Sequence, residues 1–268
     1  MRPYVLDLTL MKKVILFIFM LTMVGISAQN KKAFKAGEWL KFRLHYGYLN
    51  ACYATLHLKN ARLGSLPVYR IVAHGETTGF ASVFFEVNDT YESYFDKKEI
   101  KPYKFIRKVS EGGYTKNVEI NYDYSKGTAI LEDKKHNRKQ AFSIHQQIQD
   151  VLSAVYALRS KPNLNRLRRG QVVNMDVLFD RKGISKFRFK FLGTEILDTK
   201  FGELECLKFQ PYVLAEKVFE KQENLTFWLS NDNNRIPVRV QANIAVGSIK
   251  ADLDGYNGLM TPLNIISD

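Results

Sequence analysis

The sequence contains few of the residues that build catalytic and metal sites. Its 268 residues include only two cysteines and five histidines, and no two histidines have the HxxxH, HExxH or HxH spacing of metal ligands. A GxSxG nucleophile motif and a phosphate-binding glycine loop are also absent. We therefore predict no catalytic residue, no metal site and no cofactor, and an enzyme is less well supported than a binding protein.

Cysteine is too rare to form a structural framework. Cys52 and Cys206 are too few for a thiolate zinc site and too distant in sequence for a CxxC redox motif. Two cysteines of an exported protein can form a disulfide, but two buried free thiols are an equally ordinary outcome. The sequence leaves both alternatives open.

Long apolar runs are missing except at the N-terminus. Two lysines precede the apolar stretch 14–25, which is shorter than the roughly 20 residues of a membrane-spanning helix. A basic start, a short apolar run and a small residue at Ala28 are typical of a secretory signal peptide. We predict a signal peptide over residues 1–28, with Met11 as an alternative start. The mature chain 29–268 should be soluble and periplasmic, or alternatively secreted, and should not span a membrane.

Acidic residues are fewer than basic ones. The chain has 40 Lys and Arg against 27 Asp and Glu, which gives a formal charge of +13. In an exported protein this excess favours attraction to anionic lipid headgroups or acidic glycans over nucleic acid, although a solvated basic face needs no partner. The basic stripe that we predict to contact an anionic surface consists of Arg181, Lys186, Arg188 and Lys190.

Aromatic residues are abundant, with 18 Phe and 14 Tyr, and they favour strands. Apolar and polar residues alternate along most of the chain, as in 186–191, where phenylalanines alternate with cations. Such alternation gives one buried and one wet face and is typical of antiparallel sheet. We predict strands over residues 34–46, 51–60, 68–75, 104–109, 115–122, 128–132, 171–179, 184–192, 203–209, 224–230, 237–246 and 248–253, and a further strand running on from 91–96.

One segment has helical spacing instead. Apolar residues recur at helical spacing within 147–159, and Pro162 follows as a helix stop. A long antiparallel sheet hides its edges by curling, by closing or by covering one face with a helix. We therefore predict a mainly β fold in a single domain over residues 29–268. It should be a curved antiparallel sheet or half-open β-barrel, with one amphipathic helix at about 147–160 packed on it.

Phenylalanines mark the candidate ligand site. A curved sheet with a Phe-rich concave face has either a filled core or an apolar pocket. The segment 78–86, which holds several of these residues, reads equally as a short helix or a strand. If the face is a pocket, its lining consists of Phe80, Phe84, Phe85, Phe187, Phe189 and Phe191.

Three polar groups are weaker candidates. His45, His57 and His74 stand on successive predicted strands, and their rings approach one another only if the strand registers agree. The acidic stretch 89–96, with its tyrosines, has the composition of a sugar or cation site or of a polar strand edge. The run Asn231–Asn234 has too few carboxylates for a calcium loop, so we interpret it as a hairpin turn.

Five segments in order carry a resemblance to a known family: 89–96 (DTYESYFD), 111–114 (EGGY), 149–159 (QDVLSAVYALR), 227–238 (FWLSNDNNRIPV) and 247–253 (GSIKADL). The chain resembles the domain-of-unknown-function family 3108, exported proteins of Gram-negative bacteria, and its signal peptide resembles those of the Bacteroidetes group. The resemblance implies export and a β-rich fold and brings no established activity. The architecture alone is also similar to that of periplasmic lipoprotein carriers, and fold does not decide function.

These observations lead to three functional hypotheses. The first is a periplasmic, non-catalytic binding module for an apolar or amphipathic ligand of the cell envelope, such as a lipid, a lipoprotein or an anionic glycan. The second is a structural or assembly factor that docks to another envelope component. The third is a hydrolase of glycan or lipid, which requires a cleft where carboxylates of 89–96 meet a histidine.

Overall fold

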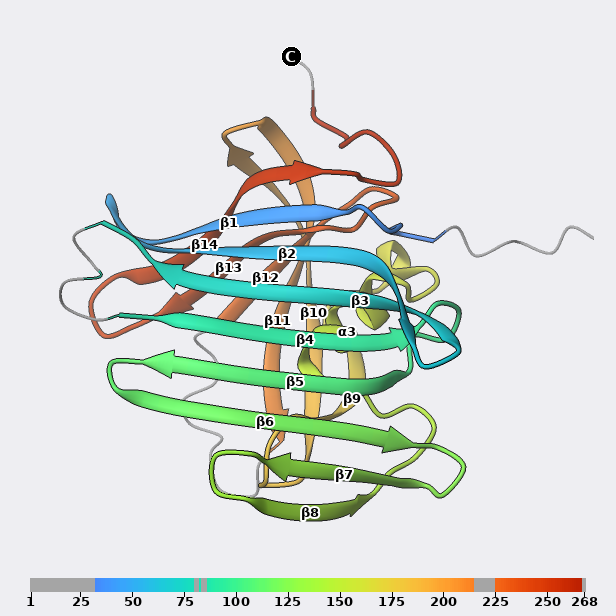
Figure 1. The fold of residues 1–268 in the computed structure, drawn as a ribbon. Helices are drawn as coiled ribbons and strands as arrows, with labels where there is room; N and C mark the ends of the chain where they lie inside the picture. Colours follow the sequence, from blue (N-terminus) through green and yellow to red (C-terminus); the bar gives the residue numbers. More distant parts are fainter. Residues whose placement is uncertain (1–31, 80–81, 83–85, 215–224, 267–268) are drawn as a thin grey trace, which may run out of the picture. The chain divides into compact units, whose positions relative to one another are not determined.

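One antiparallel sheet makes up most of the structure. The computed structural model describes residues 32–79, 82, 86–214 and 225–266. In this part of the chain fourteen strands follow the order β8-β7-β6-β5-β4-β3-β2-β1-β14-β13-β12-β11-β10-β9 (Figure 1). Their bounds are β1 Trp39–Tyr46, β2 Leu49–Leu63, β3 Leu66–Thr77, β4 Asn88–Asp96, β5 Pro102–Glu111, β6 Tyr114–Asp123, β7 Thr128–Asp133, β8 Arg138–Ser143, β9 Val172–Leu178, β10 Ile184–Thr199, β11 Gly202–Leu214, β12 Leu225–Ser230, β13 Pro237–Asn243 and β14 Ser248–Asn257.

This architecture confirms the predicted fold class. The sheet ends at β8 and β9, which do not pair with each other, so it is not closed into a barrel. Along the chain, the helix α3 (Val151–Arg159) and the short 3-10 helix η1 (Leu164–Arg166) follow β8 and precede β9. Side chains of α3 contact β2 to β4 on one side and β9 to β12 on the other, so the sheet curls around the helix (Figure 1). The predicted signal peptide and domain limits involve residues 1–31, outside the described chain, and stay predictions.

The helix begins at Val151, after its predicted start. Asp150 is the N-cap: its carboxylate accepts hydrogen bonds from the amides of Leu152 and Ser153, both at 2.8 Å. The Ser153 hydroxyl accepts one in return from the Asp150 amide, at 2.9 Å. Residues before the cap cannot join the helix because the amide and the carbonyl of Gln149 both bond to the main chain of β9, at 2.9 Å.

The apolar face of α3 fills the concave side of the sheet. Tyr156 is buried against Phe34 and Phe95, with ring centroids 4.7 and 5.6 Å away. Leu158 is fully buried and packs against Phe191 and other side chains of β9 to β12. Burial of side chains of this size contributes roughly 1.5–3 kcal/mol each, so these contacts drive the docking of the helix.

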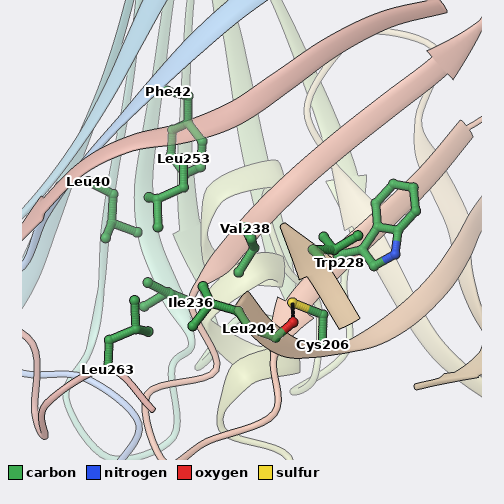
Figure 2. Packing of buried hydrophobic residues seen from close by; sticks show 10 residues of the cluster. Leu40, Phe42, Leu204, Cys206, Trp228, Ile236, Val238, Leu253 and Leu263 are labelled. Carbon is green, nitrogen blue, oxygen red and sulfur yellow. Dashed lines mark hydrogen bonds between the residues drawn. The ribbon is translucent and has the colours of Figure 1, made fainter. Parts of the chain in front are cut away.

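A further core lies away from the helix, where β1, β13 and β14 meet the hairpin of β10 and β11. Figure 2 shows Phe42 of β1, Trp228 of β12 and Leu204 of β11 among its residues. Cys206 belongs to this core, and its thiol donates to the carbonyl of Leu204 at 3.5 Å. Cys52, on β2, is half-buried, and both cysteines are free thiols in this structure.

A buried ion pair fixes the C-terminal end of the helix. The side chains of Arg159 and Glu38 are 0% and 1% exposed and bond through two guanidinium nitrogens, at 2.7 and 2.6 Å. The Tyr156 hydroxyl donates to the same carboxylate at 3.0 Å. The guanidinium also donates to the carbonyls of Asn234 and Ala33, at 3.0 and 3.2 Å. The pair therefore joins α3 to the start of β1 and to the turn between β12 and β13.

The run Asn231–Asn234 forms that turn and has a structural role. The Asp232 carboxylate accepts hydrogen bonds from the amides of Asn234 and Arg235, both at 2.9 Å, which close the turn. The Arg235 guanidinium then donates to the carbonyl of Arg159 at 3.0 Å. Because the last carbonyls of a helix lack partners within the helix, this bond satisfies one of the end carbonyls of α3.

Replacement of Arg159 tests the buried pair. Arg159→Met leaves the Glu38 carboxylate buried without its partner, which typically costs about 3–5 kcal/mol. We expect the free energy of unfolding, measured in urea, to fall by about this amount. The double variant Glu38→Leu/Arg159→Met holds no unpaired charge and should lose less than the two single variants together. Strictly additive losses would contradict a direct interaction.

Candidate functional site

Three of the six phenylalanines predicted to bind a ligand belong to the part of the chain that the structure describes, and they are buried or half-buried. Phe189 and Phe191 are 8% and 4% exposed and pack against Leu158 of α3, and Phe187 is half-buried beside them. The helix occupies the space in front of these side chains, as in a filled core. A ligand role for the set stays a prediction, and three members lie outside the described residues: Phe80, Phe84 and Phe85.

An open cleft of about 680 Å³ lies beside the C-terminal half of α3. Its walls are the turn between β4 and β5 (98–100), the segment before the helix (145–149), the helix end with the residues after it (157–162), and strands β9 and β10. Two smaller hollows, of about 290 and 370 Å³, lie over β13 and β14 and beside the Asn231–Asn234 turn. The larger cleft is the candidate site because polar groups on its walls lack partners.

Three cations on the walls have no acidic partner. Lys98, Lys161 and Arg188 come from three different walls, and in the described part of the chain none has a carboxylate oxygen within 4.0 Å. The two carboxylates of the walls, in the β4–β5 turn and on β9, already pair with a lysine and a histidine. The three cations outnumber the two carboxylates on these walls, so the cleft has a net positive charge that attracts anions.

His145, on the wall before the helix, is fixed in one tautomer. Its Nδ1 accepts a hydrogen bond from the Gln147 amide at 3.2 Å, so the proton lies on Nε2, which donates to the Asp176 carboxylate at 3.0 Å. Both ring nitrogens are thus used in structural bonds. Ser160 also lines the cleft, but its hydroxyl makes no described hydrogen bond to this ring. These two residues therefore do not form the nucleophile–base pair of covalent catalysis.

Two buried side-chain atoms of the described residues lack a hydrogen-bond partner, Arg107 Nε and Gln149 Oε1, and only Gln149 lines the cleft. It is 6% exposed and lines the cleft, yet its side-chain Oε1 has no hydrogen-bond partner. Its main chain is held by the bonds to β9, so the side chain starts from a fixed position. An unpaired buried oxygen costs about 1–3 kcal/mol, and native structures keep few of them. Gln149 therefore has an unused acceptor at the cleft wall; the oxygen is covered in this structure, and a ligand reaches it when the side chain turns toward the cleft.

Comparison of sequences places the chain in a family. Residues 41–254 match the model of a family described as a protein of unknown function, DUF3108. The chain belongs to the DUF3108 family. The match covers most of the sequence and confirms the resemblance carried by the five ordered segments. A search of the curated proteins found no match.

A solved structure shares the fold of this DUF3108 chain, and two others show a weaker likeness. A β-barrel-like protein of the domain of unknown function DUF1849 from Brucella abortus has a TM-score of 0.53 at 7% identity, over 85% of this chain and 99% of that chain. A candidate exported protein with a YmcC-like fold from Bacteroides fragilis has a TM-score of 0.32 at 10% identity, over 84% and 97%. A candidate lipoprotein from Parabacteroides distasonis has a TM-score of 0.33 at 11% identity, over 85% and 99%. The Brucella likeness concerns the fold alone, and the other two are too distant to support an argument.

The three histidines of the first strands do not meet in this DUF3108 structure. His57 lies opposite Trp39 on β1 and Val72 on β3, so the registers separate it from the other two rings. His45 instead bonds to Asp252 of β14 at 2.9 Å. Among the described residues, no group of three or more His, Cys, Asp or Glu side chains is arranged to hold a metal ion. Nor does the described chain contain a helix of the length and apolarity that crossing a membrane requires.

Carboxylates of the acidic stretch 89–96 serve the sheet itself. Asp89 accepts a hydrogen bond from an amide of β5 at 3.0 Å, and Glu92 pairs with Arg70 at 2.8 Å. Asp96 accepts two amides of the β4–β5 turn, both at 2.6 Å. None of these described bonds involves a histidine, so the stretch does not form the arrangement that the hydrolase hypothesis requires.

The predicted basic stripe contributes one residue to the cleft. Arg188 lines it, whereas Lys186 and Lys190 are exposed on the same strand. Arg181 is exposed in the turn before β10. Contact of these residues with an anionic surface stays a prediction, and the structure adds a cleft that Arg188 lines together with Lys98 and Lys161.

Asp150, next to Gln149, is a fully buried acid. Besides capping α3, it accepts a hydrogen bond from the Ser93 hydroxyl of β4 at 2.6 Å. Burial disfavours the charged form and raises the pKa of Asp150 from 3.8 to about 6. Between about pH 4 and pH 6 the folded state therefore holds a proton that the unfolded state has released, so the stability falls as the pH rises.

The variant Asp150→Asn tests this linkage. Asparagine keeps a capping oxygen but does not titrate. In the wild type the free energy of unfolding should fall by about 3 kcal/mol over this range, because the pKa is about 6 in the folded state and 3.8 in the unfolded state. The variant should lack this fall. Urea unfolding at a series of pH values measures it. Asp123→Asn, in an exposed turn, should keep the fall. A constant difference between wild type and Asp150→Asn across this range would contradict the raised pKa.

Proposed function

We propose that the protein is a non-catalytic binding module of the periplasm that holds an amphipathic ligand of the cell envelope in the cleft beside α3. The observation that carries the proposal is the buried, unpartnered Oε1 of Gln149 at the wall of an open cleft. The signal-peptide pattern and membership of the DUF3108 family are consistent with export.

The composition of the walls supports an amphipathic ligand. Ile100, Ala157 and Met175 line the cleft with apolar groups, and the three unpaired cations line it with charge. Ligand sites typically have volumes of about 300–1,000 Å³ and combine apolar walls with a few placed polar groups. At about 680 Å³ the cleft lies in this range. A ligand with an apolar part and a polar head satisfies both kinds of wall.

Native mass spectrometry of the protein purified from a bacterial periplasm tests the proposal. We expect a bound species, which extraction identifies as an envelope component. Ala157→Trp places an indole in the cleft and should remove this species. Ile130→Trp, at an exposed position of β7, should retain it. A wild-type protein that carries no ligand, and takes none up from an envelope extract, would contradict the proposal.

An exposed apolar cluster favours a second candidate, docking to another envelope component. The turns β1–β2 and β13–β14 are neighbours, because Tyr46 lies opposite Ile249 and donates to the carbonyl of Val246 at 2.9 Å. Tyr48, Leu49 and Val246 are exposed there. Apolar groups gathered at one place on a surface often mark an interaction site.

A photo-crosslinking residue at position 48 tests the docking candidate. Because the Tyr48 side chain is exposed beside the apolar cluster, the expected product in the periplasm is one defined adduct. The same residue at position 130, which is exposed on β7, is the control and should yield none. Monomer alone from both positions would count against docking.

A further inference from the structure

Resting on the proposed function, we propose that the cleft recognises a phosphate ester next to a hydroxyl group. The phosphate binds between Lys98, Lys161 and Arg188, and the hydroxyl donates a hydrogen bond to Gln149. Glycerol phosphates and sugar phosphates have this chemistry, either free or as the head group of a lipid. Two independent observations, one on charge and one on hydrogen bonding, carry the assignment.

The first observation is the excess of positive charge on the walls of the open cleft. Lys98 lies in the β4–β5 turn, Lys161 follows α3, and Arg188 lies on β10. Like charges on the walls of one cleft repel one another, and an anion between them removes the repulsion. Lysine and arginine form strong charge-assisted hydrogen bonds to phosphate. A phosphate group offers three such oxygens as a monoester and two as a diester, and each can accept from more than one donor, so it can engage all three cations.

The second observation is the unpaired amide of Gln149. Its main chain is bonded to β9, and the next residue caps α3, so its Cα is fixed at the wall while the side-chain amide is free to turn. Its Oε1 requires a hydrogen-bond donor, which a phosphate dianion is not. The ligand must therefore carry a donor beside its phosphate. A hydroxyl matches the whole amide, because it can donate to Oε1 and accept from Nε2.

Calorimetric titration of the full exported chain with three small probes tests this chemistry. We expect glycerol 3-phosphate to bind more tightly than inorganic phosphate, and glycerol not to bind. Lys161→Gln and Arg188→Gln should each weaken binding of glycerol 3-phosphate about tenfold, because each loses a hydrogen bond to a charged group. Lys108→Gln removes the same charge from an exposed position of β5 and should leave the affinity unchanged.

Gln149→Leu separates recognition from a structural role. Leucine removes the unpaired oxygen at similar volume, so the thermal midpoint should stay constant or rise. The variant should bind glycerol 3-phosphate no more tightly than inorganic phosphate. A variant with a lowered midpoint and an unchanged preference for glycerol 3-phosphate would overturn the role of Gln149.

Vesicle flotation distinguishes the two sources of the head group. Binding to phosphatidylglycerol vesicles but not to phosphatidylcholine vesicles, lost in Arg188→Gln, supports a lipid. Binding of glycerol 3-phosphate without vesicle binding supports a soluble phosphate ester. Equal affinity of wild type, Lys161→Gln and Arg188→Gln for every phosphate probe overturns the inference. An envelope ligand that native mass spectrometry still detects would then preserve the proposed function, so the two failures can be told apart.

Discussion

Burial of the Arg159 guanidinium inside the curved sheet is the constraint on which the rest of the structure depends. A buried charge without partners is very costly, so the surrounding chain has to supply an anion and carbonyl oxygens. Glu38, just before β1, supplies the anion, and Ala33 and Asn234 supply carbonyls. These partners are up to about 200 residues apart in sequence, so the helix has its full set of contacts only when the first strand and the β12–β13 turn are in place.

Buried polar contacts also fix the N-terminal end of the helix, which lies next to the cleft. Asp150 caps α3 and accepts the Ser93 hydroxyl of β4, so a second buried polar contact fixes where the helix begins. Gln149 immediately precedes this cap and bonds to β9, which places its side chain at the wall of the cleft. A helix held at both ends gives a preformed site, and preorganisation lowers the cost of binding.

Alternation predicts the strands whose two faces differ, and it fails where they do not. It misses β8, Arg138–Ser143, because this edge strand is exposed or half-exposed throughout. It ends β10 too early, because Gly193 at φ 122° takes up a register shift and the strand continues. It cannot separate a core from a pocket, since Phe189 alternates in the same way against a helix or a ligand. The cleft is harder still, and of its key residues only Arg188 is predicted as a site residue. Lys98 lies in a turn, Lys161 follows α3, and Gln149 lies inside the predicted helix but before the observed one. These residues come to one cleft only in the folded chain.

Native-state hydrogen exchange of the α3 amides tests most directly the central claim that buried polar contacts hold the helix as a fixed wall of the cleft. The amides of residues 155–159 should exchange as slowly as those of the core strand β3, by global unfolding. Exchange of these amides much faster than β3, while the sheet stays protected, would show that the helix opens locally and would contradict this account.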